Sequence, residues 1–330
     1  MNGYTAPVWL PGGNLQTIWG ARVSRRHPPG DAPVAQFLRE RWTTPDGDFI
    51  DVDHLAPAPG SAPPLRHLVM FHGLEGTSTS HYGMGFAAVA RAQGWAFSVP
   101  HFRGCSGELN RAPRAYHSGD FEEVGWILRR LRERACAPLL VAGISLGGNA
   151  LLRWAQEAGD SARATAGAVA AVSAPIDLAA AGEAIDRGFN RLVYARMFLA
   201  TMKPKALAKW SQHPGLFDRE RVRAARSIYA FDDAFTAPLH GFKDTPDYWA
   251  RASAKPQMGR LRVPALLVHA RNDPFVPFAS IPPPASPGLG VATTLWQPAH
   301  GGHVGFPQGR FPGRVLAMPE AVTAWLQAHG

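Results

Sequence analysis

The 330-residue chain is predicted to fold as a doubly wound α/β protein, with a mostly parallel sheet and a helical cap inserted into it. Three observations predict this class. Short apolar runs alternate with helix-like stretches, as expected for parallel strands that are covered on both faces. One such strand, at 139–142, leads through a glycine turn directly into a helix. From about Pro175 to Met258 the alternation stops, and an unstructured connection of that length would be improbable in a compact domain.

The elements are expected in the following order. Residues 36–56, broken by the turn 45–48, are predicted to form an antiparallel hairpin at the sheet edge. Apolar runs then predict the remaining strands, at 67–71, 96–100, 139–142, 166–172, 264–270 and 292–296. Helical patterns lie between several of these runs, at 82–93, 120–134 and 146–158.

This order divides the chain into three parts. Residues 1–175 are predicted to hold an N-terminal arm, at 8–17, and the first part of the core; residues 176–258 form a helical cap insertion, and residues 259–330 complete the core. In the cap, the stretch 189–199 places aromatic and aliphatic residues at helical spacing, with basic residues between them. Packing onto the core is the simplest explanation of this stripe. An acyl-chain pocket or a lipid-facing surface is the alternative, which periodicity does not separate from it.

Composition narrows the class of protein. With 46% hydrophobic residues the chain can bury a large core. No run reaches the roughly 18 apolar residues of a membrane helix, and the first residues lack the pattern of a signal peptide, so a cytoplasmic protein is expected. The two cysteines, Cys105 and Cys136, are too few for a disulfide framework and are expected to be reduced and structural. No metal-binding motif is present, and neither a metal nor a cofactor is expected.

The formal net charge of +9 raises the question of an anionic partner. Arginines are spread along the whole chain and lysines are confined to its middle, as a GC-rich coding bias would produce. A nucleic-acid partner is therefore not expected, because phosphate binding requires clustered cations. At most, a weak peripheral contact with an anionic surface such as a membrane is expected. The oligomeric state stays open.

A nucleophile elbow is predicted at Ser145. The sequence Gly143-Ile144-Ser145-Leu146-Gly147 fits the G-x-S-x-G pattern and lies between an apolar strand and a helix. The elbow is a tight, strained turn, so its flanking positions tolerate little beyond glycine. Chance alone would produce roughly 0.2 such pentapeptides in a chain of this length and glycine content. The strand before it and the helix after it therefore carry the prediction.

A serine hydroxyl becomes nucleophilic when an imidazole takes its proton, and that imidazole needs a carboxylate to fix its tautomer. In this arrangement the acid and then the histidine follow the serine along the chain. Asp273 lies in the turn after the strand 264–270 and is the predicted acid. His303 lies in the glycine-rich loop 298–306 and is the predicted base. The alternatives are His300 for the base and, for the acid, Asp177, Asp232, Asp233 and Asp244.

Two backbone amides are expected to form an oxyanion hole, which stabilises negative charge on the carbonyl oxygen during acyl transfer. One is the N–H of Leu146, directly after the nucleophile. The other is expected in the turn 71–76, Phe-His-Gly-Leu-Glu-Gly, where Leu74 is the candidate. His72 is expected to hold this turn. Its glycines leave room for substrate, although a turn after a strand would use glycines anyway.

Further motifs extend over nearly the whole chain. They are HGLEG at 72–76, FRGCSGE at 102–108, YHSG at 116–119, GISLGGN at 143–149, GFN at 188–190, FDD at 231–233 and GGHVGF at 301–306. Together they resemble the YheT-like, embryogenesis-associated branch of the α/β-hydrolases. The resemblance implies that fold, a triad of Ser145, Asp273 and His303, and esterase or lipase activity on short-chain carboxylic esters or monoacylglycerols. Asn14 and His101 depart from the pattern, which has His and Asn there.

The predicted function is a serine carboxylic ester hydrolase that acts through an acyl-enzyme on a small-molecule ester or acylglycerol. His303 would take the proton of Ser145 and return it to the leaving alcohol, so activity should fall at acid pH, where a protonated imidazole cannot act as a base. Two alternatives stay open: transfer of the acyl group to an alcohol on the same triad, and a catalytically silent hydrolase-fold binding protein. The acyl-chain preference depends on how the cap packs and is not predicted.

Overall fold

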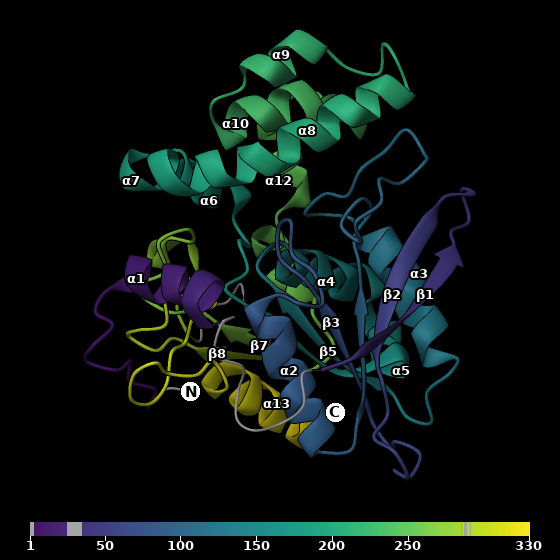
Figure 1. The fold of residues 1–330 in the computed structure, drawn as a ribbon, viewed down its shortest axis with the longest axis vertical. Helices are drawn as coiled ribbons and strands as arrows, with labels where there is room; N and C mark the ends of the chain where they lie inside the picture. The colour runs from purple at the N-terminus through teal and green to yellow at the C-terminus, as the bar shows by residue number, and fades with distance from the viewer. Residues whose placement is uncertain (1–2, 25–34, 285, 287–288, 291) are drawn as a thin grey trace.

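An eight-stranded sheet forms the centre of the computed structural model, which describes residues 3–24, 35–284, 286, 289–290 and 292–330 (Figure 1). The strands are β1 (Phe37–Thr43), β2 (Phe49–Leu55), β3 (His67–Phe71), β4 (Ala96–Pro100), β5 (Leu139–Ile144), β6 (Ala166–Val172), β7 (Ala265–Val268) and β8 (Thr293–Trp296). Their order is β1-β2-β4-β3-β5-β6-β7-β8. β2 pairs antiparallel with β1 and β4, and all other pairs are parallel, so the predicted edge hairpin and parallel sheet are confirmed.

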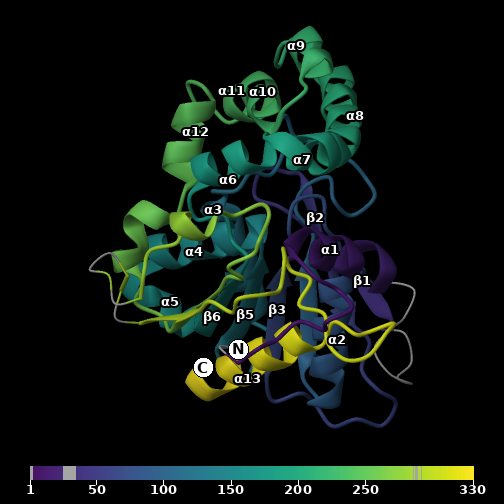
Figure 2. The same ribbon diagram turned by 90° about the vertical axis from the view of Figure 1, so that its left-hand side faces the viewer.

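Helices cover both faces of the sheet because alternate residues of a strand point to opposite sides. Leu68 and Met70 of β3 belong to the apolar cluster beneath α2 (His81–Ala92) and α13 (Ala317–His329). Val69 and Phe71 belong to the cluster on the opposite face of the sheet. The remaining core helices are α3 (Phe121–Arg132), α4 (Leu146–Ala158), η3 (Gly159–Ser161) and α5 (Ala162–Thr165). Figure 2 shows the two helical layers on opposite sides of the strands, which confirms the doubly wound class.

The sequence pattern placed most core elements to within two residues. β3, β4, β6 and α4 have the predicted bounds. β7 is shorter than the predicted run 264–270. Pro264 lacks the amide hydrogen that a strand residue donates, and the strand ends at Val268, although His269 and Arg271 still donate to the end of β8 and the segment after it.

A separate layer of helices lies above the carboxyl ends of the parallel strands (Figure 1). Its elements are α6 (Leu178–Ile185), α7 (Gly188–Asn190), η4 (Arg191–Ala195), α8 (Arg196–Gln212), α9 (Arg219–Ala224), α10 (Ile228–Phe231), η5 (Asp232–Thr236), α11 (Ala237–Leu239) and α12 (Thr245–Ala252). The chain then returns to the core through η6 (Lys255–Arg260), whose Met258 packs with α4. The layer has an apolar cluster of its own, which includes Leu199, Phe217 and Trp249. The stretch 189–199 is helical as predicted. It belongs to a continuous run through α7, η4 and α8, because the residues at both junctions keep right-handed helical dihedral angles.

The N-terminal segment forms α1 (Gly13–Ile18) and η1 (Trp19–Val23), and a short η7 (Phe278–Ser280) follows β7. Residues 1–2 and 25–34 of the predicted first part lie outside the described residues. In the part of the chain that the structure describes, every helix is too short or too polar to cross a membrane.

Candidate active site

Ser145 occupies a strained turn between β5 and α4. Its φ of 52° and ψ of −120° fall in a region that residues with a side chain rarely adopt. The Ser145 N–H donates to the carbonyl of Val172 on the neighbouring strand at 2.8 Å, which fixes the turn to the sheet. A Cβ atom on Gly143 would lie 2.5 Å from the oxygen of Gly147, and one on Gly147 would lie 2.4 Å from the oxygen of His72. Both flanking glycines are therefore sterically required.

Asp273 lies in the turn after β7, and its side chain is fully buried. Its Oδ1 accepts hydrogen bonds from the backbone N–H groups of Phe275 at 2.8 Å and Val276 at 3.2 Å. Burial alone would raise the pKa of this carboxyl. The charge and hydrogen bond of His303, together with the backbone donors, outweigh burial and hold the pKa of Asp273 below its ordinary value. The carboxylate is therefore ionised at neutral pH.

His303 lies between Asp273 and Ser145. Its Nδ1 is 2.9 Å from Asp273 Oδ2, and its Nε2 is 2.9 Å from Ser145 Oγ. Because the ionised carboxylate can only accept, Nδ1 carries the hydrogen and Nε2 is free to accept the serine proton. The ring of Phe275 lies 4.4 Å from the imidazole, centroid to centroid. The structure thus brings together the three residues that the sequence predicted for this site.

The alternative acids and the alternative base lie elsewhere. His300 is exposed. Asp177 and Asp244 cap α6 and α12, Asp232 accepts hydrogen bonds from Thr236 and Trp249, and Asp233 pairs with Arg221. Among the described residues, none of these four carboxylates forms a hydrogen bond with His303.

The N-terminal helix α1 holds the loop that carries His303. Thr17 Oγ1 accepts the backbone N–H of His303 at 2.8 Å, and Gln16 Oε1 accepts the backbone N–H of Gly301 at 2.9 Å. Gln16 Oε1 also accepts from Asn272 Nδ2 at 3.0 Å, next to the acid. Sequence reasoning expected only a packing arm here and missed these residues. The polar residues Asn14, Gln16 and Thr17 in an otherwise apolar segment were the available indication.

Close backbone contact accompanies these hydrogen bonds. A Cβ atom on Gly13 would lie 1.8 Å from the oxygen of Asn272, one on Gly302 would lie 2.6 Å from the oxygen of Gly13, and one on Gly305 would lie 2.2 Å from the oxygen of Gln16. Helix α1 can therefore approach both the acid turn and the histidine loop only because glycines stand at the contact.

The turn after β3 presents the candidate oxyanion amide. The N–H groups on either side of Leu74 are engaged: Gly73 donates to the hydroxyl of Tyr82 and Glu75 to the hydroxyl of Tyr116, both at 3.1 Å. Among the described residues, no protein group accepts a hydrogen bond from the N–H of Leu74. A Cβ on Gly73 would approach the Ser145 Cβ to 3.2 Å, so the turn lies directly against Ser145.

His72 holds this turn as predicted. Its ring accepts the backbone N–H of Phe102 at Nε2, 3.1 Å away, which leaves Nδ1 to donate to the carbonyl of Gly73 at 2.8 Å. Burial lowers the pKa of His72 to about 3, with a smaller contribution from the nearby His101, so the ring is neutral. His101 itself bonds to Asp53 at 2.8 Å and lines a second cavity rather than the one that holds Ser145. Asn14 accepts from the Tyr194 hydroxyl at 2.9 Å.

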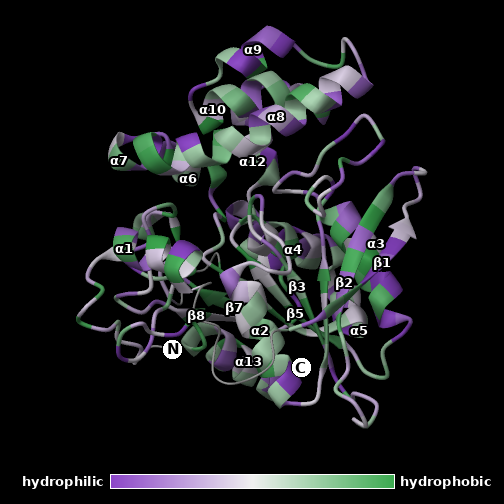
Figure 3. Ribbon diagram, viewed as in Figure 1, coloured by the Kyte–Doolittle hydropathy of each residue, from purple (hydrophilic) through white to green (hydrophobic). Residues whose placement is uncertain are grey.

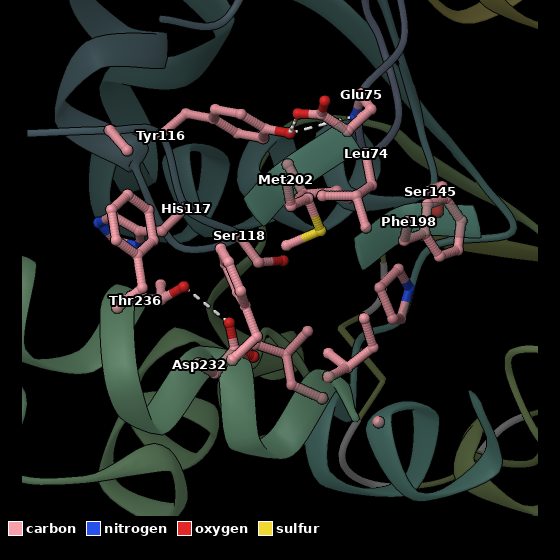
Figure 4. Close-up of a pocket in the computed structure, with 18 of the residues that line it drawn as sticks. Leu74, Glu75, Tyr116, His117, Ser118, Ser145, Phe198, Met202, Asp232 and Thr236 are labelled. Atoms are coloured by element: carbon pink, nitrogen blue, oxygen red, sulfur yellow. Dashed lines mark hydrogen bonds between the residues drawn. The ribbon is translucent and has the colours of Figure 1, made fainter. Parts of the chain in front are cut away.

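Ser145, His303, Leu74 and Leu146 all line a partly open cavity between the sheet and the helical layer, which together with its opening to solvent comprises about 1140 Å³ of free space. Its wall is mostly apolar and includes Leu178, Ile185, Phe198, Met202, Phe231 and Phe235. Figure 4 shows Ser145 and Leu74 at one side of the cavity and Asp232 with Thr236 at the other. A substrate bound here would place its reacting group at Ser145 and its apolar part against the helical layer.

Polar side chains interrupt the apolar wall at several points, and two of them are the carboxylates of Asp232 and Glu75. Burial raises the pKa of Asp232 to about 6, while hydrogen bonds from Thr236 and Trp249 act in the opposite direction. Glu75 of the oxyanion turn forms an ion pair with Lys205 of α8, Oε2 to Nζ, at 2.8 Å and accepts the Tyr116 hydroxyl at 2.9 Å. This ion pair links the turn to the helical layer.

Neither metal ligands nor disulfides are found where the structure describes the chain. No group of three or more His, Cys, Asp or Glu side chains among the described residues is arranged to hold a metal ion. Both cysteines are free. Cys105 is buried, but Cys136 is exposed, so the expectation that both are structural is wrong for Cys136.

Comparisons with known proteins identify the family of this chain. Residues 66–309 match the model of the alpha/beta hydrolase fold family. YheT of Escherichia coli (strain K12), provisionally named an esterase, is 39% identical over 293 residues, which cover 88% of this chain and 84% of YheT. Phospholipase ABHD3 of Homo sapiens is 27% identical over 340 residues, which cover 99% of this chain and 80% of that protein.

A solved structure shows the same fold. The esterase Pf2001 of Pyrococcus furiosus is 14% identical with a TM-score of 0.56, and the match covers 92% of this chain and all of that chain. At this identity the likeness concerns the fold alone. The family match and the identity with YheT decide the family: the chain belongs to the α/β-hydrolase fold family, in the branch that includes YheT.

Proposed function

We propose that this protein is a serine carboxylic ester hydrolase of the short-chain carboxylesterase or monoacylglycerol lipase type. The observation that carries the proposal is the unbroken contact from Asp273 through His303 to Ser145, with 2.9 Å from His303 to each partner, at the wall of an apolar cavity. Residues 176–258 would act as a cap insertion that closes this cavity over the substrate. The structural relative and the human relative carry esterase and phospholipase names, which agrees with this reaction class.

The proposed reaction proceeds in two steps. Ser145 Oγ attacks the ester carbonyl while His303 Nε2 takes its proton, and the alcohol leaves with that proton, so that an acyl-enzyme remains. Water, activated by the same imidazole, then releases the acid and restores Ser145. The N–H groups of Leu74 and Leu146 would stabilise the negative charge on the carbonyl oxygen, a contribution that typically lowers such a barrier by about 3–4 kcal/mol for each donor.

The surroundings of the three residues support catalysis rather than a binding role alone. The charge of His303 and the backbone donors keep the Asp273 carboxylate ionised near neutral pH. An ionised Asp273 keeps its hydrogen bond with the imidazole of His303. The positive φ of Ser145 is a strained conformation that a binding scaffold would have no reason to keep. Both features serve a reacting serine.

The cavity supports an ester with an apolar acyl chain. Most of the side chains in its wall are aliphatic or aromatic, although polar ones such as Asp232, Lys205 and Lys209 also line it. Each methylene group buried against such a wall contributes roughly 0.8 kcal/mol. We therefore expect kcat/KM to rise from an acetyl ester toward longer acyl chains, up to the length that fills the space between Ser145 and Asp232.

The test is hydrolysis of p-nitrophenyl esters from acetate to palmitate by three proteins: wild type, Ser145→Ala and Ser161→Ala. Ser161 is exposed and distant from the cavity lining, so its loss controls for the removal of a serine hydroxyl. We expect activity in wild type and Ser161→Ala and none above background in Ser145→Ala. Equal activity in all three, or in none of them while the proteins remain folded, would overturn the proposal. Adding ethanol or glycerol reports whether any acyl group passes to an alcohol instead of water.

A further inference from the structure

An exposed apolar stripe lies on the helical run 188–212, outside the cavity. Phe189, Leu192, Val193 and Met197 are 51%, 67%, 37% and 38% exposed. These four account for more than a third of the eleven large hydrophobic residues exposed in the described chain, and they fall within nine positions of one another. Figure 3 shows hydrophobic residues alternating with hydrophilic ones in the helical run that begins at α7, at the edge of the helical layer. Scattered exposed hydrophobic residues are ordinary, but a cluster of this kind marks an interaction site.

Arginines flank the stripe, whereas lysines of the same run are engaged elsewhere: Lys205 pairs with Glu75, and Lys209 is buried. The run 188–212 contains five lysines and arginines and no aspartate or glutamate. Arg191 and Arg196 alternate with the apolar residues, are exposed, and form no ion pair with any described residue. The exposed Arg22 of η1 reaches the same surface, with its Nη2 3.7 Å from the sulfur of Met197.

The other side of the same helical run belongs to the cavity. Phe198, Met202 and Lys205 line the space that holds Ser145, while Leu192, Val193 and Met197 are exposed and do not line it. One helix therefore separates the site of the proposed reaction from an exposed apolar face. A lipid-derived ester could pass from that face into the cavity around the helical run 188–212 alone.

Charge decides which partner suits this face. A second copy of the chain, related by a two-fold axis, would bring Arg191 and Arg196 toward the same arginines of its partner, and like charges oppose such contact. An anionic lipid surface offers what the face lacks: negative headgroups for the arginines and acyl chains for the apolar side chains.

We propose that the apolar stripe of Phe189, Leu192, Val193 and Met197, with Arg191, Arg196 and Arg22, docks on an anionic lipid surface. The benefit of docking rests on the proposed function, because docking would deliver lipid esters to Ser145. The binding itself does not depend on catalysis and can be measured without it.

The experiment is cosedimentation of the full chain with vesicles of phosphatidylcholine alone and of phosphatidylcholine mixed with phosphatidylglycerol. Ser145→Ala protein is used so that no lipid is hydrolysed. Leu192→Asp is compared with Leu65→Asp, because Leu65 is 81% exposed and lies in the loop before β3, far along the chain from the stripe. Arg191→Glu is compared with Arg163→Glu, an exposed arginine on α5.

We expect binding to the mixed vesicles, little to phosphatidylcholine alone, and a loss of binding as salt rises. Leu192→Asp should weaken binding about tenfold or more, and Arg191→Glu about fivefold or more. Leu65→Asp and Arg163→Glu should bind like the parent protein. Circular dichroism spectra that match the parent establish that each variant is folded.

Three results would overturn the proposal. The first is no binding of the parent protein to mixed vesicles, and the second is an equal loss of vesicle binding in the stripe variants and their controls. The third is vesicle binding that Leu192→Asp leaves unchanged, together with a dimer, detected by light scattering, that this variant dissociates. The last result would assign the face to a second copy. Hydrolysis of p-nitrophenyl acetate by otherwise wild-type Leu192→Asp protein is measured in parallel. If that ester is hydrolysed while vesicle binding is lost, the docking surface and the reaction are separate properties; absence of hydrolysis in wild type contradicts the proposed function and leaves the binding result standing.

Discussion

The hydroxyl of Thr17 accepts the backbone N–H of His303 at 2.8 Å, across a separation of 286 residues. The same hydroxyl donates to the carbonyl of Gly13 at 2.7 Å, which orients its lone pairs toward the histidine loop. Through this contact, helix α1 fixes the backbone of the residue that would act as the general base. Because proton transfer depends on the distance from Nε2 to Ser145, the position of α1 should affect the chemical step.

Replacing Thr17 with valine should lower kcat about tenfold or more with a smaller change in KM. The substitution keeps the shape of the side chain but leaves the N–H of His303 without its acceptor, a loss that typically costs about 1–3 kcal/mol. Steady-state kinetics with a p-nitrophenyl ester give both constants. Thr17→Ser keeps the hydroxyl and should retain most of the activity. Equal kcat in Thr17→Val and wild type, or equal losses in both variants, would show that this hydrogen bond does not position the base.

The pH dependence of kcat/KM should show one ionisation on its acid side. Activity falls as pH decreases because His303 must be neutral to accept a proton. Asp273 does not titrate in the same range, since its pKa is held below its ordinary value and it stays ionised as the histidine gains its proton. An acid limb that falls with the square of the proton concentration would contradict this assignment.

Asp273→Asn should reduce kcat by about 10³- to 10⁴-fold, because an amide can no longer hold Nδ1 as the protonated nitrogen or stabilise the imidazolium. The substitution preserves size, so circular dichroism and thermal unfolding should change little compared with the loss of rate. A variant within tenfold of wild type would mean that another carboxylate supplies the charge. Asp232→Asn serves as the matched control, because Asp232 lines the same cavity without touching His303.

Removing the hydroxyl of Tyr82 should weaken oxyanion stabilisation. Tyr82→Phe leaves the N–H of Gly73 without that acceptor, and the turn that presents Leu74 is then less constrained. Tyr82 does not line the cavity, so we expect kcat to fall about tenfold while KM changes little. Tyr229→Phe makes the same chemical change on an exposed ring of the helical layer and should behave like wild type. Parallel changes in kcat and KM for Tyr82→Phe would indicate general disruption of the cavity instead.

The free energy of unfolding should decrease as the pH rises from about 4 to about 6, because of the buried carboxyl of Asp232. Burial raises its pKa in the folded chain to about 6, from an ordinary value of 3.8, so the folded chain holds a proton that the unfolded chain has released. The free energy of unfolding should therefore be lower above this range than below it, by on the order of 3 kcal/mol. Urea unfolding across this range should show the decrease in wild type and a smaller one in Asp232→Asn. The same change in the free energy of unfolding with pH in both proteins would contradict the assignment to Asp232.

The sequence predicted those features that neighbouring residues determine and missed those that depend on contacts between distant parts of the chain. The elbow at Ser145 is specified by a strand, a turn and a helix within about twenty residues, so its glycines and its context sufficed to place it. Asp273 and His303 were found because the order of the fold requires an acid and then a histidine after later strands. Gln16 and Thr17 were missed because their partners lie more than 280 residues away and only tertiary packing joins them.

The stretch 189–199 shows a second limit. Its apolar residues are distributed around the helix: Tyr194 and Leu199 are buried, Phe198 lines the cavity, and Leu192 and Met197 are exposed. Periodicity identified the helix but could not tell which side faces the core, because an apolar residue occurs on every side. Packing onto the core and exposure, which the sequence offered as alternatives, both occur on the same helix.

The central claim is that Ser145 is the activated nucleophile. The most direct measurement is the intact mass of the protein after reaction with a fluorophosphonate, followed by peptide mapping of the adduct. We predict one adduct per chain, located on Ser145, in wild type and Ser161→Ala, and none in folded Ser145→Ala. An adduct on another serine, or no adduct on folded wild-type protein, would contradict the claim.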